Sequence, residues 1–173
     1  MWCLSETNID GFFLSSLILQ IGFFVDAHVS DLISSMLPEG YSVVSHLFLL
    51  FFLILMIAFR SKGVICFFSV LLGLLFDYYY VDYIGILSLA LPFGTIIVLG
   101  LLRFFSGHIS QSQFFLFFTL YMFLVDVSSF ILASSYQLTD VTFPYVMTFQ
   151  MAPTLIVNLL ILFCFRKLIL SQF

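Results

Sequence analysis

The chain has 173 residues, of which 63% are hydrophobic and only 8% are charged, and its formal net charge is −4. A soluble domain carries about 25% charged residues, so this composition excludes an aqueous globule and indicates lipid as the solvent. Five basic residues in all cannot build a phosphate-binding surface, which excludes nucleic acid as a partner.

Six apolar segments of membrane-spanning length follow one another along the chain. A transmembrane helix needs about 20 mostly apolar residues. We predict such helices at about residues 9–25, 42–59, 63–80, 83–102, 114–133 and 146–165. The expected fold class is therefore an all-α membrane protein, with six transmembrane helices in one bundle and a single polytopic domain over 1–173.

The first predicted helix carries a polar face, which includes Ser16 and Gln20 and is expected to pack on other helices. The loop that follows contains acidic residues and no basic one. We predict a short amphipathic helix at about residues 31–37 of this loop, ended by Pro38 and Gly40.

The third predicted helix places Ser69, Gly73 and Asp77 on one face, because each lies four residues after the last. Such a groove of small residues lets a neighbouring backbone approach closely. Asp77 has two interpretations: it ends a groove that binds another helix, or it caps the turn before the fourth helix. In the fourth helix, Pro92 is expected to produce a kink.

The fifth predicted helix contains Asp126 between apolar residues, so this carboxyl group should lie well inside the bilayer. A charged side chain there costs about 2.5–3.5 kcal/mol on insertion scales. Three roles stay open: a protonated acid that hydrogen bonds across helices, a proton or cation relay, and a buried contact that orients the bundle. No basic residue is expected at this depth, so we favour a structural hydrogen bond to Asn158, Thr154 or Gln20.

The basic residues predict the orientation of the chain. All of them follow even-numbered helices: Arg60, Lys62, Arg103, Arg166 and Lys167. The loops after odd-numbered helices carry only acidic charges. Because Lys and Arg remain on the cytoplasmic side of membranes, we predict that both termini are cytoplasmic.

No catalytic or metal-binding motif stands out. The three histidines, His46 among them, lie in or beside loops on both predicted sides of the membrane, so we expect no shared metal site. The three cysteines have no paired spacing, and HExxH, GxSxG and phosphate-binding glycine loops are missing from the sequence. We expect no enzyme activity, no metal and no cofactor.

Several short features together resemble the MreD family, small membrane proteins of the bacterial rod-shape and cell-wall elongation machinery. In chain order they are Leu17, Leu19 and Gln20; Gly73 and Asp77, with Gly85 eight residues later; Val125-Asp126; Ala152-Pro153-Thr154 with Asn158; and Arg166 with Lys167. The resemblance covers nearly the whole chain. The sequence departs from it in being rich in phenylalanine and in having a strongly acidic first loop.

The resemblance implies a non-enzymatic scaffold in the bacterial cytoplasmic membrane, with a fold similar to the substrate-binding (S) components of energy-coupling-factor transporters. It implies binding to MreC within the membrane, and action with MreB, a SEDS glycosyltransferase and a class B penicillin-binding protein. We expect the helix-packing or partner contacts at Gln20, Gly73, Asp77, Gly85, Asp126, Pro153 and Asn158.

The alternative is a small-molecule binding S component that holds a vitamin. Such a protein needs a polar pocket that opens outward, together with Trp or Arg side chains that hold the ligand. The chain has a single tryptophan, Trp2, at the wrong end, and no basic residue on the predicted outer side. The sequence gives no indication of the oligomeric state.

Overall fold

The computed structural model describes residues 22, 25–38, 40–58, 61–105 and 110–170. This part of the chain is helical and contains no strand. Its elements are α2 (Leu47–Ala58), α3 (Lys62–Phe76), the π-helical turn η1 (Asp77–Val81), α4 (Leu87–Phe104), α5 (Gln111–Ser135), α6 (Phe143–Val146), the π-helical turn η2 (Met147–Met151) and α7 (Ala152–Leu170). Residues 25–35 are also helical.

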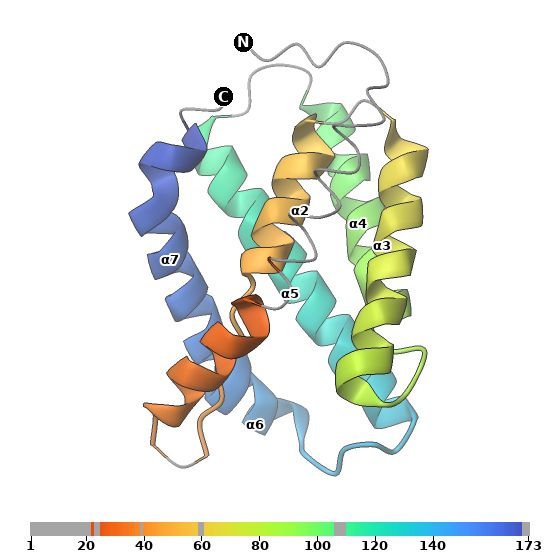
Figure 1. Ribbon diagram of the computed structural model, residues 1–173, viewed down its shortest axis with the longest axis vertical. Coiled ribbons are helices and arrows are strands. Elements are labelled where there is room, and N and C mark those ends of the chain that lie inside the picture. The colour runs from red at the N-terminus through yellow and green to blue at the C-terminus, as the bar shows by residue number, and fades with distance from the viewer. Residues whose placement is uncertain (1–21, 23–24, 39, 59–60, 106–109, 171–173) are drawn as a thin grey trace.

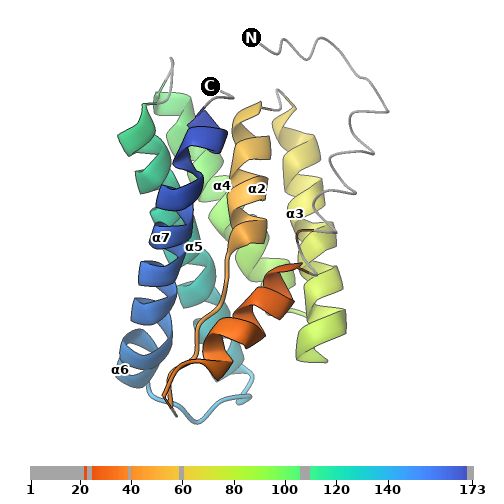
Figure 2. The ribbon, with the colours of Figure 1, turned by 60° about the vertical axis from the view of Figure 1, so that its left-hand side comes forward.

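The long helices run side by side along the longest axis of the molecule (Figures 1 and 2). The most extensive packing joins α3 to α4 and α4 to α5. The short helix 25–35 lies obliquely at one end of the bundle, near the start of α2 (Figure 2). The prediction of an all-α bundle is confirmed for the described residues.

Four helical stretches are long and apolar enough to cross a membrane: Lys62–Tyr79, Leu87–Phe104, Gln111–Ser135 and Phe143–Cys164. They match the third to sixth predicted helices, although the fourth begins at Leu87 rather than near residue 83. Helix α4 continues through Pro92. The first predicted helix, 9–25, lies almost entirely outside the described residues, so the count of six spans stays a prediction.

The predicted start of the second helix, at residue 42, is wrong. Helix α2 begins at Leu47, and residues 41–46 form a non-helical segment, called the 41–46 segment below. The predicted helix 31–37 is also misplaced, because the helix observed there covers residues 25–35. Asp26 therefore lies in a helix and not in a loop.

The apolar core lies between α2, α4 and α5. Its fully buried side chains include Phe48, Phe52, Leu53, Met56, Leu91, Val98, Phe118 and Met122, together with Tyr121 and with Leu162 from α7. The hydroxyl of Tyr121 lies 3.0 Å from Thr95 Oγ1, so the polar end of this ring has a partner inside the core. Large apolar side chains on the outer faces, such as Phe67 and Phe93, remain exposed, as expected of helices that face lipid.

Candidate functional site

Asp77 caps the start of α4. Its carboxylate accepts the backbone N–H groups of Gly85 at 2.8 Å, Ile86 at 3.1 Å, Leu87 at 2.7 Å and Ser88 at 3.0 Å, and the Ser88 hydroxyl at 2.7 Å. These amides would otherwise lack partners, and the carboxylate also complements the positive end of the helix dipole. The interpretation of Asp77 as a cap is confirmed.

The groove beside Asp77 is filled by the same chain. A Cβ atom at Gly73 would lie 2.5 Å from Ser88 Cα and 2.6 Å from the carbonyl oxygen of Leu87, so α3 and α4 touch at this glycine. Ser69 is also fully buried. The expected close approach of a backbone is therefore present, but the helix that approaches is α4, and a partner's helix has no access to this groove in the structure.

Gly85 belongs to the turn between η1 and α4. Its φ of 123° is a conformation that residues with a side chain rarely adopt, and a Cβ there would lie 3.1 Å from the hydroxyl of Tyr136. Gly85 therefore shapes the loop that brings its own N–H to Asp77. This is a role within the chain.

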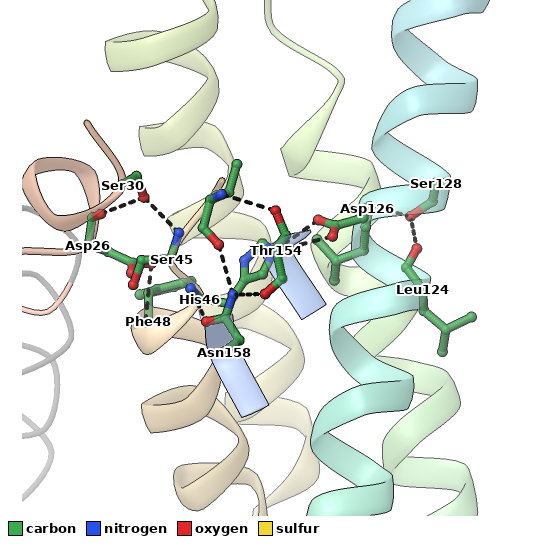
Figure 3. A network of polar contacts seen from close by, with 12 residues as sticks. Asp26, Ser30, Ser45, His46, Phe48, Leu124, Asp126, Ser128, Thr154 and Asn158 are labelled. Carbon is green, nitrogen blue, oxygen red and sulfur yellow. Dashed lines mark hydrogen bonds and ion pairs between the residues drawn. The ribbon is translucent and has the colours of Figure 1, made fainter. Parts of the chain in front are cut away.

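The 41–46 segment has neither helix nor sheet partners, yet every backbone N–H from residue 42 to residue 48 is hydrogen bonded. The acceptors, in order, are Phe149 O at 3.1 Å, Ser34 Oγ at 3.0 Å, Thr154 Oγ1 at 3.1 Å, Ser30 Oγ at 2.7 Å, Asn158 Oδ1 at 2.7 Å, Asp26 Oδ1 at 3.0 Å and Asp26 Oδ2 at 3.3 Å. Buried backbone groups outside helices and sheets must find their hydrogen-bond partners elsewhere. The acceptors named above meet that requirement, and Figure 3 shows those of Asp26, Ser30, Thr154 and Asn158.

Asn158 of α7 binds the segment from both sides. Its Oδ1 accepts the His46 N–H at 2.7 Å, while its Nδ2 donates to the carbonyl of Val44 at 2.8 Å and to that of Thr154 at 2.8 Å. The side chain is buried, at 2% exposure. Asn158 therefore ties the 41–46 segment to α7, while Asp26 caps the first turn of α2.

Pro153 explains one of these contacts. A proline has no N–H, so residue 153 cannot donate to the carbonyl of Phe149 four residues earlier. That carbonyl lies in the π-helical turn η2 and accepts the N–H of Ser42 instead. The 41–46 segment is therefore bound by the start of α7 in three ways: through the carbonyl that Pro153 leaves free, and through the side chains of Thr154 and Asn158.

Asp126 pairs with His46. The His46 Nε2 atom lies 3.2 Å from Oδ1 and 3.3 Å from Oδ2 of Asp126, whose side chain is 23% exposed. The predicted partners Asn158 and Thr154 are wrong, because the 41–46 segment occupies both. The third, Gln20, lies outside the described residues. The expectation that no basic side chain reaches Asp126 is also wrong: α2 begins only at Leu47, so His46 extends from non-helical chain toward α5.

The pairing affects the protonation of His46, which precedes α2 and lies outside the spanning helices. Burial disfavours the charged imidazolium, but the carboxylates of Asp126 and Asp26 outweigh this effect and raise the pKa of His46 above its ordinary value. Sequence reasoning missed His46. The available signal was the three polar residues Ser42, Ser45 and His46 at the start of an otherwise apolar segment.

A cavity of about 650 Å³ adjoins these side chains. Its polar lining includes Asp26, Ser45, His46, Asp126 and Ser129. Small-molecule sites commonly have volumes of about 300–1,000 Å³, so the cavity is large enough for a ligand. Among the residues that the structure describes, no group of three His, Cys, Asp or Glu side chains is placed to hold a metal ion.

Comparison with known families matches residues 11–171 to the model described as "rod shape-determining protein MreD". No curated protein and no solved structure matches the chain. The family model spans nearly the whole sequence, including the α3–α4 pair with its Asp77 cap. It also includes the side chains that bind the 41–46 segment and the start of α2, called the clasp below: Asp26, Ser30, Ser34, Thr154 and Asn158. The chain therefore belongs to the MreD family of rod shape-determining membrane proteins.

Proposed function

We propose that this protein is a non-enzymatic scaffold of the rod-shape machinery, located in the bacterial cytoplasmic membrane, where it binds MreC. Membership of the MreD family supports a role in rod-shape determination. The observation that carries the scaffold role is the use of Asp26, Asp77 and Asn158. All three are buried and bind backbone groups of this chain. Buried polar side chains that bind the protein's own backbone stabilise one arrangement of the helices, and other membrane proteins can bind to its outer surface.

The binding surface for MreC lies on the lipid-facing side of the bundle. The groove at Gly73 is occupied by α4, so it cannot supply this surface without unpacking the fold. Helix association in lipid depends on close packing of complementary surfaces. The exposed faces of the spanning helices therefore remain for a single-span partner.

Photo-crosslinking from each spanning helix tests this proposal. A photoreactive amino acid is placed at one exposed position per helix, namely Phe67, Phe93, Leu116 or Leu160, which are 66%, 54%, 61% and 59% exposed. The buried position Met122 serves as the control. We expect adducts with MreC from one helix or two neighbouring ones, and none from Met122. Normal production with no MreC adduct from any exposed position would contradict the proposal.

We infer the orientation of the bundle from its charges. The start of α3, with Lys62, and the end of α4, with Arg103, lie at one end (Figure 1). The η1–α4 turn, with Asp82, and the α5–α6 loop, with Asp140, lie at the other end. The positive-inside rule supports a cytoplasmic position for the basic end, and hence for both termini if six helices span the membrane. Reporter fusions to the two termini test it: both must report the cytoplasm.

A vitamin-binding S component is the second candidate, and the cavity is the observation that favours it. The cavity lining contains no Lys or Arg among the described residues, so it offers no basic group for a vitamin carboxylate. A thermal-shift screen of vitamins on the purified protein separates the two functions, because a tight ligand stabilises its receptor.

A further inference from the structure

We propose that the cavity beside the 41–46 segment binds a small amphiphilic amine, with the ammonium group at Asp126 and the apolar body against the aromatic lining. This binding site goes beyond the scaffold role. Three features of the cavity lead to it: its walls, a hydroxyl group in its lining, and its charge.

The walls of the cavity come from every element at this end of the bundle. The helix 25–35, the 41–46 segment, α4, α5 and η2 all contribute, so a ligand would contact several elements at once. Much of the lining is aromatic: Phe48, Phe76, Phe130, Tyr145 and Phe149. Such walls suit an apolar ligand body, and their ring faces attract a cation.

One hydroxyl group in the lining, that of Ser129, lacks a partner within the described residues. The buried Oγ of Ser129 makes no hydrogen bond within the described part of the chain, whereas the Oγ of Ser45, which is 1% exposed, lies against the carboxyl group of Asp26. Both residues line the cavity. Ser129 follows Asp126 by three residues on α5, so the two share a helix face. Buried polar atoms normally find a hydrogen-bond partner, and a ligand with N–H donors would provide one.

The charge of the lining favours a cation. The lining contains the carboxyl groups of Asp26, Asp31 and Asp126, which outnumber the single imidazole of His46, and it contains no Lys or Arg among the described residues. Both oxygens of Asp26 are used by the first amides of α2. Within the described ranges Asp126 has His46 as its one side-chain partner and is 23% exposed, so its oxygens have lone pairs left for a second donor. With no cluster of three metal-ligating side chains in the described ranges, an organic ammonium fits better than a metal ion.

The test uses 4-phenylbutylamine as the probe, with 4-phenylbutanol and 4-phenylbutyrate as neutral and anionic analogues of the same shape. Thermal unfolding of the full-length protein in detergent is followed at rising probe concentration. We expect the amine to give a saturable rise in Tm that both analogues fail to give. Equal shifts with all three probes would mean partition into detergent and would overturn the proposal.

Variants locate the effect. Asp126→Asn removes the charge that would bind the ammonium group. Ala133→Phe fills part of the cavity from a lining position two helical turns further along α5 and keeps Asp126. Asp140→Asn is the control, because it changes an exposed carboxylate outside the cavity. The amine response must disappear in the first two variants and persist in the third. A response that survives Ala133→Phe would overturn the proposal even if Asp126→Asn fails to fold.

A lipid headgroup could supply the same ammonium chemistry as a free amine. Repeating the titration in phosphatidylglycerol nanodiscs, with and without phosphatidylethanolamine, separates these sources. Loss of the probe response when phosphatidylethanolamine is present assigns the site to the lipid, and an unchanged response assigns it to a free amine.

Discussion

Replacing Asn158 by leucine tests how much the clasp on the 41–46 segment contributes to stability. The substitution keeps a side chain of similar length but removes the acceptor of the His46 N–H and the donor to the Val44 carbonyl. The segment has no helical register of its own, so both backbone groups would lose the only partners that the described residues give them. The damage should therefore exceed the loss of one side-chain contact.

The size of the effect follows from these two groups. A buried backbone group left unsatisfied costs about 1–3 kcal/mol. Side-chain hydrogen bonds between membrane helices average only about 0.6 kcal/mol, since the unfolded chain in lipid also finds partners. We therefore expect Asn158→Leu to lower the free energy of unfolding by about 2–4 kcal/mol, toward the lower part of the summed range for two orphaned groups.

Reversible unfolding in mixed micelles, followed by circular dichroism as the fraction of denaturing detergent rises, measures this change. The matched control is Leu160→Ala on the same helix, since Leu160 is 59% exposed and faces away from the segment. A surface change of this kind should stay within about 0.5 kcal/mol of the unmodified protein. If Asn158→Leu unfolds at the same detergent fraction as the control, the clasp does not hold the segment and the reasoning fails.

Three further predictions concern the other buried contacts. Asp77→Ala should lower the free energy of unfolding by about 2 kcal/mol or more, at the top of the range for helix caps, because four amides and a hydroxyl lose their acceptor. The exposed control Asp82→Asn should leave the unfolding curve unchanged. Gly73→Ala should destabilise by about 1–3 kcal/mol through overpacking against α4, and a gain in stability in the same unfolding assay would refute the contact. The pKa of His46 is higher in the folded protein than its ordinary value of about 6.5, so protonation of His46 stabilises the fold. This stabilisation is complete when the pH is below the ordinary pKa, and it is lost as the pH rises through the pKa of the folded protein. Melting curves of the unmodified protein should therefore show a lower Tm at pH 9 than at pH 6, and His46→Gln should lack this difference. Equal pH dependence in both proteins would contradict the pairing.

Hydropathy predicted the long helices because lipid exposure requires apolar outer faces over a fixed length. Helices α3 to α5 and the α6–α7 stretch appear close to where the sequence placed them. The spacing of Ser69, Gly73 and Asp77 correctly predicted a close backbone approach. It could not identify which helix approaches, because small residues indicate proximity but not the partner.

The start of the second helix could not be predicted from its own sequence. Residues 41–46 stay non-helical because side chains as far as 110 and 112 positions away satisfy the amides of Val44 and His46. A hydropathy window does not detect partners so distant in the chain. The same error hid the contact between His46 and Asp126, since the reach of the imidazole toward α5 depends on non-helical backbone.

Part of the site was nevertheless visible in the sequence. Pro153 necessarily leaves the carbonyl four residues earlier without a helical donor, and Thr154 and Asn158 follow on the interior side of the same helix. These residues together indicate that the start of this helix hydrogen bonds to backbone groups of another segment. What they bind became evident only from the fold, where the 41–46 segment lies against α7 (Figure 3).

Hydrogen–deuterium exchange of the protein in lipid nanodiscs tests most directly whether the 41–46 segment is held by the side chains of its neighbours. We predict that the amides of residues 42–48 exchange as slowly as those of α3, although most of them lie outside any helix. The loop at residues 139–142, at the same end of the bundle, should exchange fast, because its amides have few partners. Equally fast exchange of both stretches would contradict the clasp and the rigid scaffold that depends on it.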